Sequence, residues 1–209
     1  MFIKICGITS EEDALLAVAL GADAIGFVFA PSPRQIAPTK ALDIVKRLPS
    51  DVITVGVFRD EHPKRVLEIA RSARLKGVQL HGNEPIDAVR TVTAEVRFAI
   101  KAVVAGTDFA RRADEYGTDA ILVDNARPGS GQRFDWSLLD ELPSGLRVML
   151  SGGIDPDNVR EAILTRQPWG VDVSSGVERE PGVKDAVKMR RFITAAREAQ
   201  AVLGDDLVD

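Results

Sequence analysis

Hydrophobic positions along this chain fall into short runs that alternate with longer segments of helical spacing. The short runs are rich in β-branched and aromatic residues, as buried strands are, and cover 2–8, 24–30, 53–58, 77–81, 96–103, 120–124, 147–151 and 170–174. The segments between and after them, with apolar residues at helical spacing, are 11–20, 41–48, 64–74, 86–93, 109–116, 135–142, 158–166 and 184–202. The pattern predicts eight strands alternating with eight helices. Ser10 can cap the first helix and Gly21 can end it.

This alternation also predicts how the strands are connected. Strands joined by helical crossovers run parallel, because such a connection needs about a dozen residues or more. The first and last strands begin at residues 2 and 170, seven repeats apart, so one repeat takes about 24 residues. A doubly wound open sheet would carry a Gly-x-Gly-x-x-Gly turn after an early strand, and none follows the strands here. We therefore predict an α/β fold, a single (β/α)8 TIM barrel domain over residues 1–209.

Composition excludes several classes of protein. The 209 residues are 45% hydrophobic and 28% charged, which is ordinary globular usage and argues against a disordered chain. The net charge is −4, so we expect no general affinity for nucleic acid or an anionic membrane. The longest apolar stretch, 14–30, is broken by Asp23 and by glycines, unlike a membrane span. With one cysteine and no basic, apolar leader, the chain is expected to be cytoplasmic.

The first strand ends on a cysteine, and in a (β/α)8 barrel the active site lies at the carboxyl ends of the strands. Alternation puts Lys4 and Cys6 on one face of this strand, and Ile3 and Ile5 on the other. If the isoleucines pack against helices, Lys4 and Cys6 point into the barrel. A lone cysteine is usually a small buried hydrophobe. Its position at a strand end beside an ammonium group makes it equally a candidate reactive thiol.

Three further strand ends carry polar side chains. Asp124 follows four apolar residues, and a carboxyl group partly removed from water there would have the raised pKa that suits a general acid. The alternative is an aspartate that caps a helix or a loop. Gln79 and His81 share one face of the fourth strand, and Asp172 and Ser174 share one face of the eighth. Each pair fits either a core polar network or direct catalysis, with substrate positioning between the two.

Two late turns have the composition of a phosphate site. The seventh strand ends in Ser151, Gly152 and Gly153, and the eighth ends in Ser174, Ser175 and Gly176. Glycines let backbone N–H groups approach an anion closely, and serine hydroxyls add donors. A Gly-Gly pair alone is more often a simple turn. Two such turns after strands 7 and 8, the usual phosphate position of this fold, indicate a phosphate site.

Arg34 lies on a proline-stiffened loop after the second strand. A solvated surface arginine is the default at such a position. The prolines, however, reduce the entropy lost when the planar guanidinium is held against a carboxylate. Arg34 is therefore a candidate ligand for an anionic substituent.

Several segments carry a resemblance to a known family. They are Lys-Ile-Cys-Gly-Ile-Thr at 4–9, Gly-Phe-Val-Phe at 26–29, Ser-Pro-Arg at 32–34, Val-Gly-Val-Phe at 55–58, Val-Gln-Leu-His-Gly at 78–82, Phe-Asp-Trp at 134–136, Leu-Ser-Gly-Gly at 150–153 and Gly-Val-Asp-Val-Ser-Ser-Gly-Val-Glu at 170–178. In this order, over nearly the whole chain, the sequence resembles the phosphoribosylanthranilate isomerases of tryptophan biosynthesis. One departure is the run 129–133, Gly-Ser-Gly-Gln-Arg, where the family usually has Gly-Gly-Thr-Gly.

The resemblance implies a reaction and roles for particular residues. The reaction would be the Amadori rearrangement of N-(5-phosphoribosyl)anthranilate to 1-(2-carboxyphenylamino)-1-deoxyribulose 5-phosphate, without cofactor or metal. Cys6 would be the general base, Asp124 the general acid, and Arg34 the ligand of the anthranilate carboxylate. His81 and Asp172 are expected to bind substrate. A free thiol titrates near a pKa of about 8.5, and we take Lys4 as the candidate that lowers the pKa of Cys6.

Two alternatives stay open from the sequence. Another phosphosugar isomerase or epimerase, such as the related histidine-pathway isomerase, is similar in chemistry but has an aspartate where Cys6 stands. A non-catalytic phosphate-binding barrel would hold Cys6 and Asp124 in structural roles. The only partner expected is a small phosphosugar, and the chain is expected to be a monomer or a homodimer.

Overall fold

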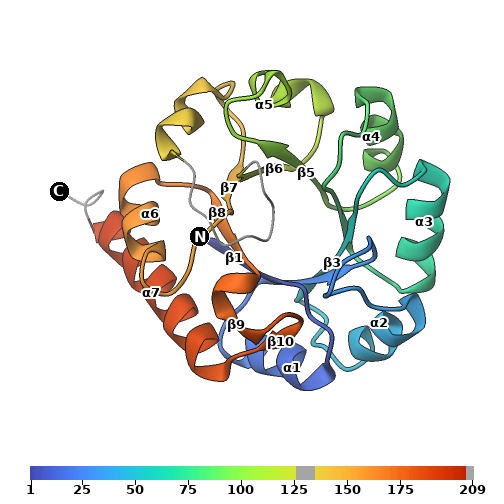
Figure 1. Cartoon of the computed structure of the whole chain (residues 1–209), viewed down its shortest axis with the longest axis horizontal. Coiled ribbons are helices and arrows are strands. Elements are labelled where there is room, and N and C mark those ends of the chain that lie inside the picture. The colour runs from blue at the N-terminus through green and yellow to red at the C-terminus, as the bar shows by residue number, and fades with distance from the viewer. Residues whose placement is uncertain (126–134, 206–209) are drawn as a thin grey trace.

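The predicted strands close into a parallel barrel (Figure 1). The structure is a computed structural model that describes residues 1–125 and 135–205. Neighbouring strands pair in sequence order, and β8 pairs with β1 to close the ring. The barrel strands are β1 Phe2–Cys6, β2 Ala24–Val28, β3 Ile53–Phe58, β4 Gly77–Leu80, β5 Ala99–Val104, β6 Ala120–Asp124, β7 Val148–Leu150 and β8 Gly170–Val173. The (β/α)8 prediction is confirmed, and the open sheet is excluded.

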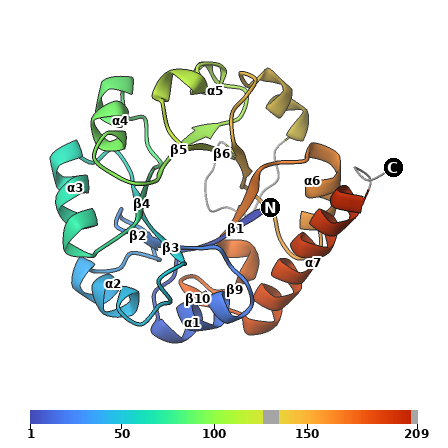
Figure 2. The ribbon, with the colours of Figure 1, turned by 180° about the vertical axis from the view of Figure 1, so that it is seen from behind.

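Helices follow the strands and cover the outside of the barrel (Figures 1 and 2). The α-helices are α1 Glu11–Ala19, α2 Pro38–Val45, α3 Pro63–Ser72, α4 Ile86–Thr93, α5 Asp108–Arg111, α6 Val159–Arg166 and α7 Ala186–Asp205. Three 3₁₀ helices cover η1 Ala113–Tyr116, η2 Trp136–Glu141 and η3 Ser175–Val177. Within the described part of the chain, no helix is long and apolar enough to cross a membrane.

Two predicted α-helices differ in kind from the expectation. The segment 109–116 divides into α5 and η1 because the backbone at Arg112 leaves the helical region, with φ −112° and ψ 24°. The segment 135–142 forms a 3₁₀ helix, η2. Pro143 follows it directly in the sequence and disfavours further helix at Leu142.

The first helix begins and ends where the sequence predicts. The Ser10 side chain accepts a hydrogen bond from the Asp13 backbone N–H at 3.2 Å. Acidic residues fill the first turn, where they interact favourably with the helix dipole. Beyond the other end, Gly21 has a φ of +101°, which glycine adopts at little cost. Both predicted end signals of α1 are therefore present.

Alternation along β1 separates the core from the interior of the barrel. Ile3 and Ile5 are fully buried in a hydrophobic cluster that includes residues of α1 and α7. On the opposite face, Lys4 Nζ lies 2.7 Å from Asp172 Oδ1 of β8. Cys6 lines a cavity at the carboxyl end of the strands. The predicted division of this strand is confirmed.

A small hairpin between β8 and α7 is missing from the sequence prediction. Its strands, β9 Glu178–Glu180 and β10 Val183–Lys184, are antiparallel. The last helix therefore begins at Ala186, not at residue 184. The reason is that Lys184 is committed to β10 and directs its buried Nζ to within 2.9 Å of the Glu178 Oε1 atom.

Aromatic rings fill the end of the barrel where the strands begin. Phe2 stacks on Trp169 with ring centroids 4.7 Å apart, and Phe98 lies 5.8 Å from Phe2. At the same end, Arg197 of α7 donates a hydrogen bond to the Met1 carbonyl oxygen at 2.7 Å. These contacts pack the floor of the barrel and leave the functional candidates at the other end.

Candidate active site

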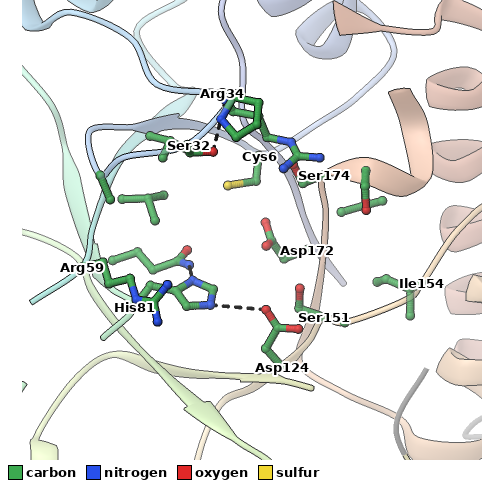
Figure 3. A pocket seen from close by; sticks show the side chains of 18 of the residues that line it. Cys6, Ser32, Arg34, Arg59, His81, Asp124, Ser151, Ile154, Asp172 and Ser174 are labelled. Carbon is green, nitrogen blue, oxygen red and sulfur yellow. Dashed lines mark hydrogen bonds and ion pairs between the residues drawn. The ribbon is translucent and has the colours of Figure 1, made fainter. Parts of the chain in front are cut away.

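The carboxyl ends of the strands surround a cavity of about 450 Å³ (Figure 3). The predicted site residues that line it are Cys6, Arg34, His81, Asp124, Gly152, Gly153, Asp172, Ser174 and Ser175. Arg59, which sequence reasoning did not single out, also lines it. In the view of Figure 3, Cys6 and Asp124 lie on different sides of the cavity, with Asp172 between them. The fold thus brings strand ends from across the whole sequence to one site.

Cys6 is buried at the end of β1, with 7% of its surface exposed. Burial raises the pKa of its thiol above the ordinary value, and the Asp172 carboxylate acts in the same direction, while Lys4 and Lys184 oppose both. The expectation that Lys4 lowers the pKa of Cys6 below the ordinary value is therefore wrong. The physical reason is that burial of the thiol outweighs the lowering effect of Lys4, and the Asp172 carboxylate, 2.7 Å from Lys4 Nζ, opposes Lys4 further. At neutral pH the thiol is the resting form.

The raised pKa gives a direct prediction for the reactivity of Cys6. Only the thiolate reacts with iodoacetamide, so we expect the alkylation rate of the folded protein to rise with pH to a midpoint above that of an ordinary thiol. Cys6 is the only cysteine in the sequence, so intact mass spectrometry reads one site. The control is the same protein in denaturant, where burial is lost. A midpoint for the folded protein at or below the denatured one would contradict the prediction.

Asp124 ends β6 and is 4% exposed. Its Oδ1 accepts a hydrogen bond from the Asn125 backbone N–H at 2.7 Å, and its Oδ2 lies 3.3 Å from His81 Nε2. On the other side of the ring, His81 Nδ1 lies 2.7 Å from Gln79 Nε2. With the amide donating to Nδ1, a neutral imidazole carries its hydrogen on Nε2, facing Asp124. Gln79 and His81 therefore lie on one face, as predicted, and His81 lies between the Gln79 amide and the Asp124 carboxyl group.

The two predicted glycine-serine turns lie together at the cavity, except for one residue. Gly152 and Gly153 line it after β7. Gly176 is not among the lining residues, because it lies where a Cβ would come within 2.3 Å of the Ile154 carbonyl oxygen. Its lack of a side chain lets η3 pack closely against the loop after β7. Gly176 thus contributes to the packing of the turn and does not line the cavity.

The loop after β2 brings Arg34 to the cavity, where a carboxylate of the protein itself holds it. Arg34 Nε and Nη2 donate to Glu178 Oε1 and Oε2 at 2.8 and 2.7 Å. Lys184 Nζ donates to the same Oε1 atom at 2.9 Å. Although burial alone would raise the pKa of Glu178, Arg34 and Lys184 hold it below the ordinary value. The sequence predicts that prolines stiffen the Arg34 loop, but it does not indicate Glu178 as the partner of Arg34.

A second cavity of about 320 Å³ adjoins the first and shares His81 and Asp124 with it. In its wall, Lys101 Nζ lies 2.8 Å from Glu84 Oε2 and donates to the Gly82 carbonyl oxygen at 2.6 Å. Glu84 in turn accepts from the Gly82 backbone N–H. This buried pair holds the loop that follows His81. No local pattern in the sequence indicates this pair, because Lys101 and Glu84 are 17 residues apart.

A thiol, a carboxyl group and two glycine-serine turns thus share one cavity at the carboxyl ends of a parallel barrel. The fold and site define a (β/α)8-barrel protein with the groups for acid–base chemistry on an anionic ligand. The model of the N-(5′-phosphoribosyl)anthranilate (PRA) isomerase family matches residues 3–195. The chain therefore belongs to the phosphoribosylanthranilate isomerase family.

Individual relatives agree over almost the whole chain. The N-(5′-phosphoribosyl)anthranilate isomerase of Thermotoga maritima is 48% identical over 201 residues, which are 93% of this chain and 98% of that protein. The crystal structure of the Thermus thermophilus phosphoribosylanthranilate isomerase matches with a TM-score of 0.89 and 44% identity, covering 95% and 99% of the two chains. A second crystal structure, of a phosphoribosylanthranilate isomerase in complex with reduced 1-(o-carboxyphenylamino)-1-deoxyribulose 5-phosphate, matches with a TM-score of 0.84 and 43% identity and has the same coverage.

Proposed function

We propose that this chain catalyses the Amadori rearrangement of N-(5-phosphoribosyl)anthranilate in tryptophan biosynthesis. The observation that carries the proposal is the cavity shared by Cys6, Asp124 and the turns after β7 and β8, in a member of this family. A relative covering the same fold binds a reduced carboxyphenylamino deoxyribulose phosphate. The histidine-pathway alternative is not favoured, because the family model and the relatives above are anthranilate isomerases.

Asp124 is proposed as the general acid that opens the ribose ring. Its protonated carboxyl group gives a proton to the ring oxygen as the bond from that oxygen to C1′ breaks, which leaves a protonated Schiff base on the anthranilate nitrogen. Asp124 is then a carboxylate. His81 Nε2, at 3.3 Å from Oδ2, is placed to stabilise that negative charge.

Cys6 is proposed as the general base of the second step. The positive charge of the Schiff base acidifies the proton on C2′, and the Cys6 thiolate removes it to give an enolamine, which tautomerises to the amino ketone. In the free protein the thiol is protonated because its pKa is raised. A cation formed beside the sulfur favours the thiolate, so the thiol gives its own proton to solvent in the cavity before the sulfur takes the C2′ proton. Ring opening thus activates the base for the step that follows.

The remaining polar groups are proposed to hold the substrate. The phosphate would bind the turns at Gly152–Gly153 and Ser174–Ser175, where backbone N–H groups and hydroxyls line the cavity. Arg34 would take the ring carboxylate, at the side of the cavity nearer Cys6. Asp172 has one oxygen on Lys4, so its second oxygen can accept a hydrogen bond from a substrate hydroxyl.

Turnover measurements test this function directly. We expect the protein to consume phosphoribosylanthranilate, followed by the loss of anthranilate fluorescence, and to leave the substrate of the histidine-pathway isomerase unchanged. Turnover of the histidine-pathway substrate alone would overturn the proposal. Turnover of neither substrate would favour the non-catalytic phosphate-binding barrel.

Gly152→Ala provides a test of how tightly the acid is held. Gly152 has a φ of +73°, and an added Cβ would lie 2.6 Å from Asp124 Oδ1. We expect turnover to fall on the order of 10- to 10²-fold, because the methyl group displaces the carboxyl group from its working position. Gly117→Ala is the matched control, since Gly117 has a φ of +68° with nothing within 4 Å. Equal losses in the two variants would attribute the effect to backbone strain alone.

A further inference from the structure

Arg34 is fixed at both ends of its side chain. At its aliphatic stem, Gly7 leaves room that a side chain would fill, because an added Cβ there would lie 2.6 Å from Arg34 Cδ. At its head, Glu178 takes two parallel hydrogen bonds of 2.8 and 2.7 Å. The Arg34 side chain is 15% exposed and the Glu178 side chain is 5% exposed. The guanidinium therefore has one orientation imposed by the protein before any ligand binds.

In this orientation, part of the Arg34 guanidinium is not used by Glu178. A guanidinium has five N–H groups in a planar fork. Glu178 uses the edge formed by Nε and Nη2 of Arg34. Two N–H groups on Nη1 and one on Nη2 remain, and the edge between these two nitrogens presents a second parallel pair. That pair matches a planar carboxylate in the same bidentate manner.

The charges around Glu178 keep this free edge attractive to an anion. Lys184, with a fully buried side chain, contributes a second cation at 2.9 Å from the Glu178 carboxylate. The three side chains Arg34, Glu178 and Lys184 together carry a net charge of +1. The carboxylate that positions Arg34 therefore does not cancel its attraction for a substrate carboxylate.

The β9–β10 hairpin is what places Glu178 beside Arg34. Glu178 begins β9, and the turn of the hairpin packs on the arginine loop, since a Cβ added at Gly182 would lie 3.1 Å from the Pro33 carbonyl oxygen. Thr9 Oγ1 donates to the Gly182 carbonyl oxygen at 2.6 Å. The hairpin is thus anchored to two loops: the loop after β1, which follows Cys6, and the loop after β2, which contains Arg34.

We propose that Glu178 is a positioning residue for substrate recognition: it holds one edge of the Arg34 guanidinium so that the other edge receives the ring carboxylate of the substrate. This inference rests on the proposed function. The competing explanation is that the Arg34–Glu178 pair only fastens the hairpin to the barrel. The two explanations differ in whether loss of Glu178 affects ligands with and without a ring carboxylate to different extents.

Calorimetric binding of two probes tests the difference. The first probe is reduced 1-(o-carboxyphenylamino)-1-deoxyribulose 5-phosphate, and the second is the same compound without the ring carboxylate. For Glu178→Gln we expect the Kd of the first probe to rise on the order of 10- to 100-fold, because a charge-assisted bidentate contact is lost. The Kd of the second probe should stay unchanged. Equal weakening of both probes, or no weakening of the first, would overturn the proposal.

The chain offers a matched control for this variant. Arg112 Nε and Nη2 donate to Glu115 Oε1 and Oε2 at 2.6 and 2.7 Å, which is the same fork geometry away from the cavity. Glu115→Gln should leave the Kd of both probes unchanged. If Glu178→Gln does not fold, Glu178→Asp keeps the charge but is one methylene too short to hold both nitrogens. It should then weaken the first probe selectively, and the same two outcomes would overturn the proposal.

The wild-type protein separates failure of this inference from failure of the proposed function. If it turns over phosphoribosylanthranilate while Glu178→Gln treats both probes alike, only the role of Glu178 falls. If it shows no turnover and binds both probes equally, the proposed function falls, and the role of Glu178 falls with it.

Discussion

Replacing Cys6 by serine is expected to lower kcat by about 10²–10⁴-fold while the fold stays intact. The serine hydroxyl is nearly isosteric with the thiol, so the packing of β1 against Gly26, where an added Cβ would meet Cys6 Sγ at 2.8 Å, is preserved. A hydroxyl ionises far above neutral pH and cannot take the C2′ proton at a useful rate. Steady-state turnover of phosphoribosylanthranilate measures the effect.

Binding of the reduced product analogue serves as the control for Cys6→Ser. Binding should persist in the variant, because Arg34 and the turns after β7 and β8, which are proposed to hold the analogue, do not depend on the thiol for their hydrogen bonds. If turnover of the variant matched that of the wild type, Cys6 would be a structural residue. Another group would then have to act as the general base.

Asp124→Asn is expected to remove turnover almost completely, by about 10³–10⁴-fold, while phosphate-bearing analogues still bind. The amide keeps the size of the carboxyl group and can still accept from the Asn125 N–H at the Oδ1 position. It cannot deliver a proton to the ring oxygen, so the first step fails. Rapid-mixing fluorescence under single-turnover conditions, with analogue binding by calorimetry, measures both parts.

Asp119 supplies the matched control for this variant. It precedes the same strand, β6, and its Oδ2 accepts from the Ala99 backbone N–H at 2.7 Å, at the opposite end of the barrel. Asp119→Asn should therefore leave kcat unchanged. If Asp124→Asn lost analogue binding to the same degree as turnover, Asp124 would be a binding residue and the assignment as acid would be wrong.

The parts of this protein that could be predicted from sequence are those set by local periodicity. Alternation within five residues is enough to place Lys4 and Cys6 on the inner face of β1, and the structure confirms it. The eightfold repeat predicts the barrel, because each βα unit buries its apolar face against its neighbours in the same way. Placement at the carboxyl ends then follows from the fold alone.

The parts that could not be predicted depend on contacts between distant residues. Burial of Cys6 is the main reason that its pKa is raised, and Asp172, which adds to this effect, is 168 residues from the Lys4 with which it pairs. Arg34 and Glu178 are 144 residues apart, so nothing near Arg34 indicates that its guanidinium already has a partner. Such pairs can be identified only when the arrangement of the strands and loops in space is known.

The error in the predicted start of the last helix, at residue 184 in place of Ala186, has a related origin. The apolar pattern of 184–202 continues smoothly into α7, and nothing in it marks the two-residue strand β10. Lysine is a good helix former, but Lys184 is held in the hairpin by the buried carboxylate of Glu178. Tertiary electrostatics therefore override local helix propensity at this position.

Arg197 links the last helix, α7, to the start of the first two strands. Besides the Met1 carbonyl oxygen, its guanidinium contacts the Gly21 carbonyl oxygen and the Asp23 carboxylate at 2.9 and 2.8 Å, all on the rim where strands begin. Loss of this one side chain would therefore release the last helix, the start of β1 and the turn before β2 together, so Arg197 couples the local opening of three segments that are far apart in the sequence.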